Sequence, residues 1–200
     1  MSRDMKGKKT GAPLLTVEDL HVRIPTSKGV VFAVNGVSFI LDYGRTLAIV
    51  GESGSGKSML SRAVLRLLPK SAATGPNSRI HFEGQDLNAL PEKQINAVRG
   101  RKIGMVLQDP MSALNPVMKV GDQVAESLRV HMGMKRKPAW ERAVALLREC
   151  GIPGPEQRMR QYPHQLSGGL VQRAAIAIAL SCEPRLLIAD EPTTALDVTI

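Results

Sequence analysis

The feature that most constrains the fold is an eight-residue loop, Gly-Glu-Ser-Gly-Ser-Gly-Lys-Ser, at residues 51–58. It matches the Gly-x-x-x-x-Gly-Lys-[Ser/Thr] pattern, in which glycines let successive backbone N–H groups approach phosphate oxygens. Lys57 supplies a positive charge for the β- and γ-phosphates, and the Ser58 hydroxyl is a hard ligand for Mg²⁺. A nucleoside triphosphate with Mg²⁺ is therefore the predicted ligand. The candidate binding residues are Gly51, Glu52, Ser53, Gly54, Ser55, Gly56, Lys57 and Ser58.

The segments on either side of this loop support the interpretation. Residues 46–50 form a short apolar run typical of a buried parallel strand, and residues 57–68 carry apolar side chains at helical spacing. A flexible Gly/Ser linker is the alternative, but it would not be bracketed by a buried strand and an amphipathic helix. The order strand, loop, helix predicts an α/β fold, and the positive end of the helix adds to the phosphate site.

Composition narrows the class of protein. The 200 residues are 43% hydrophobic but only 3% aromatic, and the formal net charge is +9. This length suits one domain with a substantial core, and so few aromatic side chains leave little surface on which single-stranded nucleic acid could stack. The basic residues are spread along the chain, which favours a solvated surface, with contact to acidic lipid head groups as the alternative. We expect no nucleic-acid partner.

Cysteines and termini indicate the compartment. Cys150 and Cys182 lie far apart without a Cys-x-x-Cys pattern, so neither a metal site nor a disulfide scaffold is indicated and a reducing cytosol is expected. The start of the chain has no apolar signal region, and no run is long enough to cross a membrane. We expect residues 1–13 to be a mobile basic tail and residues 14–200 to form the folded domain.

The remaining pattern predicts a mixed β-sheet core with two additions. Two β-rich stretches near the start, the second interrupted by Asn35-Gly36, predict an antiparallel part. Pro110 and Pro116 break the chain after a buried strand, which predicts a helical subdomain inserted over about residues 109–165. The expected strands span residues 14–24, 30–40, 79–82, 102–108 and 185–189, and the expected helices about 120–130, 140–150 and 171–181.

Two further motifs carry chemistry. The apolar strand before Asp190 and Glu191 would present both carboxylates at the carboxyl edge of a parallel sheet. Asp190 suits a magnesium ligand held through water, and Glu191 suits a general base that deprotonates the attacking water. Such acid pairs are common by themselves, and the upstream phosphate loop favours function here. Ser167-Gly168-Gly169 opens a helix and is a second possible anion site, although a plain N-cap is the more common explanation of that pattern.

In this order the motifs resemble those of ATP-binding cassette (ABC) proteins over about residues 14–200. Walker A is the loop at 51–58, the Q-loop glutamine is Gln108, the signature is 166–170, Walker B ends at Asp190 and Glu191, and the D-loop is Ala195-Leu196-Asp197. The runs Gln-Asp-Pro-Met-Ser-Ala-Leu-Asn-Pro at 108–116 and Tyr-Pro-His at 162–164 resemble the ATPase subunits of bacterial dipeptide, oligopeptide or nickel importers.

The resemblance implies roles for individual residues. Two such domains pack head to tail, so Ser167, Gly168 and Gly169 would contact the γ-phosphate of the ATP bound by the partner. Gln108 would touch Mg²⁺ or the attacking water, and Asp197 would lie at the nucleotide. For Phe32 the alternatives are stacking on adenine and a plain role in the core.

The resemblance also implies partners. They are membrane permease subunits, a second ATP-binding subunit that is identical or paralogous, and indirectly an extracytoplasmic solute-binding protein. The chain would sit peripherally at the cytoplasmic face of the inner or plasma membrane, where ATP closes the dimer and hydrolysis reopens it.

Departures from the family pattern keep other readings open. Leu170 stands where the wider superfamily often has Gln, but the peptide-importer branch tolerates an apolar residue there, so this departure supports the narrower resemblance. The chain stops at Ile200, before the family's switch histidine, so we expect either a fragment or an incomplete catalytic set. One rival is a soluble cassette ATPase of DNA repair or translation. Those tend to carry coiled-coil insertions, whereas 58 residues without sustained heptads separate Gln108 from Ser167. Another rival is a truncated, hydrolysis-deficient nucleotide-binding module.

Overall fold

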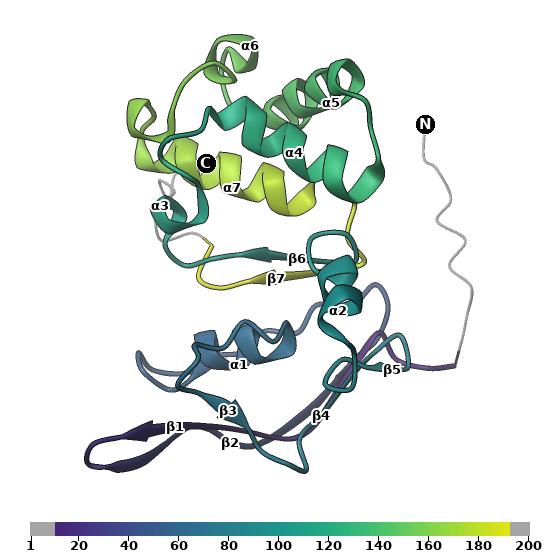
Figure 1. The fold of residues 1–200 in the computed structure, drawn as a ribbon, viewed down its shortest axis with the longest axis vertical. Coiled ribbons are helices and arrows are strands. Elements are labelled where there is room, and N and C mark those ends of the chain that lie inside the picture. The colour runs from purple at the N-terminus through teal and green to yellow at the C-terminus, as the bar shows by residue number, and fades with distance from the viewer. Residues whose placement is uncertain (1–10, 193–200) are drawn as a thin grey trace. The chain divides into compact units, whose positions relative to one another are not determined.

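The computed structural model describes residues 11–192 and divides the chain into two compact units, Met1–Leu90 and Pro91–Ile200. The first unit is an antiparallel sheet with one helix, and the second is a parallel strand pair covered by helices (Figure 1). Each unit has its own buried apolar residues.

The first unit is built on a long hairpin of β1 (Leu15–Thr26) and β2 (Gly29–Leu41). Its antiparallel register runs from Leu15 opposite Leu41 to Thr26 opposite Gly29, which confirms the expected antiparallel start. Leu15 and Val17 alternate onto the buried face, and after a register shift Leu20 and Val22 do so again. The sheet order is β2-β1-β4-β5, with β3 also paired to β1. The shorter strands are β3 (Ala73–Thr74), β4 (Arg79–Phe82) and β5 (Gln85–Asp86).

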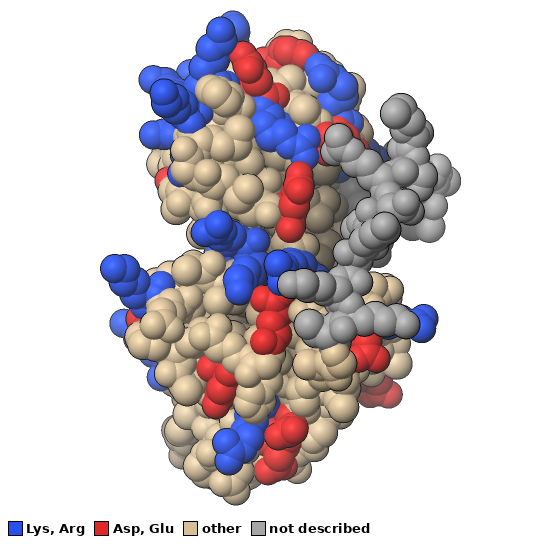
Figure 2. Space-filling model, turned by 90° about the vertical axis from the view of Figure 1, so that its right-hand side faces the viewer, with Lys and Arg blue, Asp and Glu red and all other residues tan. Residues whose placement is uncertain are grey.

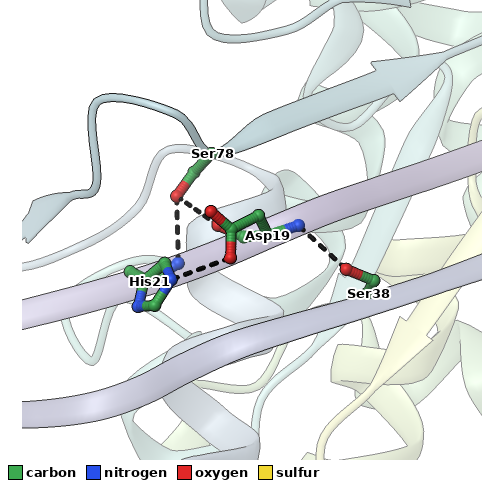
Figure 3. A network of polar contacts seen from close by, with 4 residues as sticks. All are labelled: Asp19, His21, Ser38 and Ser78. Atoms are coloured by element: carbon green, nitrogen blue, oxygen red, sulfur yellow. Dashed lines mark hydrogen bonds and ion pairs between the residues drawn. The ribbon is translucent and has the colours of Figure 1, made fainter.

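The Asn35-Gly36 interruption is an irregularity inside one continuous strand, because β1 and β2 shift register around Asp19. Asp19 has a left-handed φ of 46°, and three polar contacts to Asp19, together with one between His21 and Ser78, hold it there (Figure 3). Its N–H donates to Ser38 Oγ at 2.9 Å, and its carboxylate lies 2.9 Å from His21 Nε2. The Ser78 hydroxyl donates to the Asp19 carbonyl and accepts the His21 N–H, both at 2.9 Å. Side chains from two strands and one loop therefore fix this bulge.

The helix after the phosphate loop, α1 (Lys57–Val64), is shorter than the helix expected over 57–68. It ends in a Schellman motif: the Leu67 N–H donates to the Arg62 carbonyl at 2.8 Å, and the Arg66 N–H donates to Ala63. Arg66 takes the left-handed position that glycine usually fills, with a φ of 53°. Its guanidinium donates to the carbonyls of Leu87 and Leu90, which holds this unusual C-cap in place.

The expected strand at 46–50 does not form. None of the described strands pairs with this segment, and Leu47, Ile49 and Val50 are 42%, 44% and 89% exposed. A strand exists only where its backbone N–H and C=O groups form hydrogen bonds with a neighbouring strand. An apolar composition without such a partner is therefore not enough to form a strand. The prediction from the apolar run was wrong for this reason.

The second unit contains the expected parallel strands. β6 (Ile103–Val106) and β7 (Leu186–Ala189) pair in parallel, with Ile103 opposite Leu186 and Val106 opposite Ala189. Helix α2 (Glu92–Val98), which the sequence analysis did not anticipate, precedes β6. Few residues in the sequence indicate this helix: Pro91 and Glu92 lie at its start, and Ile95 and Val98 lie at helical spacing on its buried side.

Helices fill the chain between β6 and β7. In Figure 1, α7 lies between the β6–β7 pair and helices α4 and α5, and the apolar faces of these three helices form one core. The expected helices near 120–130, 140–150 and 171–181 are confirmed, while the boundaries of a helical subdomain at 109–165 stay a prediction. No helix among the described residues is long and apolar enough to span a membrane. The helices are α3 (Pro110–Ala113), α4 (Val120–Met132), α5 (Arg136–Glu149), α6 (Pro155–Arg158), the 3₁₀ turn η1 (Pro163–Gln165) and α7 (Gly168–Leu180).

Candidate active site

The phosphate loop is shaped by its own lysine and glycines. Lys57 Nζ donates to the carbonyl oxygens of Gly51 at 2.8 Å and Glu52 at 2.9 Å, so the ammonium group draws the start of the loop towards the helix. Gly56 has a φ of 94°, and a Cβ atom there would lie 1.9 Å from the Ala33 carbonyl oxygen of β2. Only glycine fits this close approach of two backbones.

The N-terminus of α1 is open to an anion. Gly56 occupies the N-cap position with no side-chain hydrogen bond, and the first turn of α1 contains no acidic residue. The first N–H groups of a helix lack partners within the helix and carry its positive dipole end. With the Ser58 hydroxyl in the same turn, the loop offers backbone N–H groups, an ammonium group and a hydroxyl, which suits a phosphate chain.

The two carboxylates stand where β7 ends. Asp190 is 5% exposed, and its N–H continues the parallel ladder by donating to the Val106 carbonyl at 3.0 Å. Gln108, two residues beyond β6, donates from Nε2 to Glu191 Oε2 at 2.8 Å, although 83 positions separate the two residues. Parallel pairing explains this meeting, because the carboxyl ends of neighbouring parallel strands share one edge.

The backbone beside these residues is held by local features. Asp109, next to Gln108, caps α3 by accepting the Met111 N–H at 3.0 Å, and Pro110 fills the first helical position. Glu191 has a left-handed φ of 47°. An L residue rarely adopts this conformation without surrounding contacts that maintain it. One such contact was not anticipated: Gln172 Nε2 of α7 donates to the Pro192 carbonyl at 2.9 Å.

The candidate magnesium ligands fit that ion in type. Mg²⁺ prefers oxygen ligands, and Ser58, Gln108 and Asp190 offer a hydroxyl, an amide and a carboxylate oxygen. Gln108 uses its Nε2 on Glu191, which leaves Oε1 as its possible ligand atom. Among the described residues there is no group of three or more His, Cys, Asp or Glu that could hold a metal ion, so a dedicated all-protein metal cage is not found there. Ser58 belongs to the first unit and Gln108 and Asp190 to the second, so their joint role in holding a cation stays a prediction.

The signature turn is an N-cap in this structure. Ser167 Oγ accepts the Leu170 N–H at 3.4 Å at the start of α7. Among the described residues, a Cβ atom on Gly168 would meet nothing within 4 Å, so packing within that part of the chain does not require glycine there. Gly169 follows in the same first turn. The geometry therefore matches the plain N-cap alternative and leaves room for an outside group over Gly168.

Two further candidates have different outcomes. Phe32 on β2 is 52% exposed, with the Arg23 guanidinium carbon 5.4 Å from its ring centroid. The alternative that Phe32 is a core residue is therefore wrong, and stacking on adenine stays a prediction. Asp197 lies outside the described residues.

Charged side chains of both signs are interspersed on the surface (Figure 2), and neither cysteine forms a disulfide. On the face drawn in Figure 2, Lys and Arg occur in several groups with Asp and Glu between them. Burial raises the pKa of the Cys150 thiol. The negative charge of Glu149 raises this pKa further, and the positive charge of Arg173 lowers it. Both Cys150 and the buried Cys182 are free cysteines. A thiol with a raised pKa is a poor nucleophile near neutral pH.

Comparison with known proteins decides the family. The model of the family described as ABC transporter matches residues 34–194. The chain belongs to the ABC transporter family. Among its relatives, the oligopeptide transport ATP-binding protein OppD of Bacillus subtilis is 54% identical over 187 residues, covering 94% of this chain and 52% of that protein. The dipeptide transport ATP-binding protein DppD of the same organism is 52% identical and is covered to 56%.

Solved structures confirm the fold of this ABC transporter family member. The dimeric bacterial ABC transporter cassette MJ0796 matches with a TM-score of 0.82 and 27% identity, over 92% of this chain and 76% of that one. The same cassette in a post-hydrolysis state bound to ADP and Pi matches equally well. The predicted class, an α/β P-loop NTPase fold of the ABC type, is confirmed. The chain spans about half the length of the curated relatives it matches.

Proposed function

We propose that the chain is the ATP-binding and hydrolysing part of a subunit that energises a membrane importer of peptides. The observation that carries this proposal is the identity of 54% and 52% to ATP-binding proteins of oligopeptide and dipeptide transport, over 94% of the chain. Related solutes such as nickel are the alternative cargo, because the motifs at 108–116 and 162–164 resemble both kinds of importer.

The phosphate loop binds the triphosphate of ATP. Backbone N–H groups of residues 51–58 donate to phosphate oxygens, and Lys57 moves its ammonium group from the Gly51 and Glu52 carbonyls to the β- and γ-phosphates. Exchanging carbonyl oxygens for charged phosphate oxygens strengthens the hydrogen bonds of Lys57. Phe32, exposed on β2, offers its ring to the adenine.

The carboxylates perform the hydrolysis. Glu191 accepts the proton of the attacking water, and Gln108 orients the Glu191 carboxylate through the 2.8 Å hydrogen bond and contacts the water or the metal. Ser58 and Asp190 would be the further residues that hold Mg²⁺, Asp190 being suited to a contact through water. When bound, Mg²⁺ neutralises charge that develops on the phosphate oxygens.

The proposed transporter contains further subunits. A second ATP-binding subunit, identical or paralogous, presents its Ser167, Gly168 and Gly169 equivalents to the γ-phosphate, and Asp197 lies close to that nucleotide. The space over Gly168 supports this role, since none of the described residues comes within 4 Å of a Cβ atom built there. The pair docks on membrane permease subunits at the cytoplasmic face, and an extracytoplasmic solute-binding protein delivers the peptide.

Nucleotide binding is tested with Lys57→Ala in the whole protein. The substitution removes the charged donor at the phosphates and the two loop contacts, so we expect the affinity for MgATP to fall by at least about 100-fold. Titration calorimetry measures this. Lys28→Ala is the matched control, because Lys28 is an exposed lysine at the β1–β2 turn and its loss removes the same charge. Equal affinity of Lys57→Ala and wild type would refute the assignment of the phosphate loop.

The transport role needs a different measurement. The whole protein is co-purified with the permease that associates with it and reconstituted with peptide-loaded binding protein. We expect ATP turnover to rise with peptide and to stay basal without it. A rise with Ni²⁺ in place of peptide would identify the alternative cargo. Stimulation by DNA or ribosomes and none by a permease would favour the rival, a soluble cassette ATPase.

A further inference from the structure

Helix α7 contains a glutamine in a position made for an apolar side chain. Gln172 is 0% exposed and lies on the face of α7 that also buries Val171 and Ala175. Its Nε2 donates to the Pro192 carbonyl at 2.9 Å, across 20 positions of sequence. No hydrogen bond from the described residues reaches its Oε1 atom. The amide is therefore buried with only part of its hydrogen-bonding capacity used.

Packing does not explain this amide. A buried polar atom without a partner is unfavourable, and an apolar side chain of similar length would fill the same volume without that penalty. What the amide uniquely supplies is one N–H group aimed at one carbonyl. A residue that breaks a local rule of stability in this way is commonly found beside a functional site.

The carbonyl that Gln172 holds follows the candidate general base. Glu191 has a φ of 47°, and Pro192 comes directly after it, so a contact on Pro192 restrains the left-handed turn from its far side. On the near side, the Asp190 N–H is fixed by the Val106 carbonyl at 3.0 Å. The Glu191 carboxylate itself accepts a hydrogen bond from Gln108 at 2.8 Å. The turn is thus held before, at and after Glu191.

We propose that Gln172 is a positioning residue that keeps the backbone at Glu191 in its left-handed conformation, so that the carboxylate stays on Gln108 and points at the attacking water. This inference rests on the proposed role of Glu191 as the general base. Proton transfer to a carboxylate depends steeply on its placement, and a displacement of about 1 Å can lower the rate about 100-fold. Gln172 itself touches no substrate.

The test is Gln172→Met in the whole protein with MgATP. Methionine keeps the length of the side chain, lacks the N–H donor, and removes the unpartnered oxygen. We expect kcat to fall by about 10-fold or more while KM and the calorimetric affinity for MgATP stay within about 3-fold, because the phosphate loop is untouched. Expressing kcat per bound nucleotide excludes any unfolded fraction from the comparison.

Gln123→Met is the matched control. Gln123 is a second buried glutamine of the same unit, but its amide is fully engaged: Oε1 accepts the Asn115 N–H, and Nε2 donates to the Asn115 and Met118 carbonyls. We expect this variant to melt at a lower temperature than wild type with an unchanged kcat per bound nucleotide. A purely structural role of Gln172 would produce that same pattern in Gln172→Met and would overturn the proposal.

A double variant tests whether the fall in kcat of Gln172→Met acts through Glu191. In a Glu191→Gln background, Gln172→Met should lower the remaining turnover by less than about 2-fold, since the base that it positions is already gone. A further loss of 10-fold in that background would overturn the inference. The outcomes also distinguish failure of this inference from failure of the proposed function. If the wild type has no ATPase activity, or if Glu191→Gln is fully active, the proposed chemistry is refuted. If the wild type is active, Glu191→Gln is inactive and Gln172→Met is fully active, only the inference about Gln172 is refuted.

Discussion

The phosphate loop of the first unit and the acid edge of the second unit reach their shapes by different means. In the loop, the contacts described above are short in sequence or made by backbone: Lys57 donates to carbonyls five and six positions away, and Gly56 packs against the Ala33 carbonyl. At the acid edge, the contacts are side-chain hydrogen bonds across 83 and 20 positions, from Gln108 to Glu191 and from Gln172 to Pro192.

The difference shows how each half tolerates change. The phosphate loop depends on glycine conformations and on its own lysine, so we expect an added side chain to damage it by clashing with neighbouring backbone. An edge made from distant side chains is damaged by loss of a single donor or acceptor, while its strands and helix stay packed. Glu191→Gln and Gly56→Ala test this contrast directly, and Ser78→Ala and Gly168→Ala extend it to the bulge of β1 and the signature turn, with expected effects that decrease from the first to the last.

The largest effect is expected at the acid edge. Glu191→Gln keeps the shape of the side chain but cannot accept a proton, so we expect ATP turnover to fall about 10²–10⁴-fold with nucleotide binding retained. Steady-state hydrolysis and calorimetry on the same sample measure both. Wild-type turnover in this variant would place the general base elsewhere and remove the acid edge from the comparison.

Adding one carbon to the loop comes next. Gly56→Ala would put a Cβ 1.9 Å from the Ala33 carbonyl oxygen at a φ of 94°, so we expect unfolding to become easier by about 3 kcal/mol or more, with loss of ATP binding. Gly54→Ala is the control: its φ of 80° is also left-handed, but a Cβ there meets nothing within 4 Å. Chemical denaturation that ranks the two variants equally would show that the backbone contact does not matter.

A smaller effect is expected from the bulge of β1. Ser78→Ala removes the hydroxyl that donates to Asp19 and accepts from His21, both partly buried contacts, so we expect a loss of about 1–3 kcal/mol in stability. Ser38→Ala removes an exposed contact to the same Asp19 and should cost less than about 1 kcal/mol. Urea unfolding compares them. A larger loss for Ser38→Ala would mean that the network of Figure 3 is not what holds the bulge.

The smallest structural effect is expected at the signature turn. Gly168→Ala meets open space within the chain, so stability should stay equal or rise by up to about 1 kcal/mol, because alanine favours helix over glycine. ATP turnover should nevertheless fall about 10-fold if a partner's γ-phosphate approaches this turn, since an added methyl group keeps the N–H donors away. Unchanged turnover would leave Ser167-Gly168-Gly169 as an N-cap and nothing more.

The sequence by itself determined the features that depend on neighbouring residues. The loop at 51–58, the helices after it and after Ser167, the antiparallel hairpin and the acids at the end of β7 were all predicted from local pattern and spacing. Resemblance to a known family supplied the residue roles, and comparison with relatives confirmed that family. Local patterns suffice for these features because glycine conformations, N-caps and period-two alternation act over a few residues.

Only the tertiary structure decided the features that need a distant partner. Residues 46–50 have the composition of a strand, but none of the described strands pairs with them. Arg66 ends α1 early because carbonyls more than 20 positions away hold its guanidinium. In the sequence, nothing distinguishes Gln172 from the other residues of α7, and only the structure shows that its amide donates to the Pro192 carbonyl. Pairing and buried hydrogen bonds depend on which segments meet in space, and no local pattern in the chain encodes that meeting.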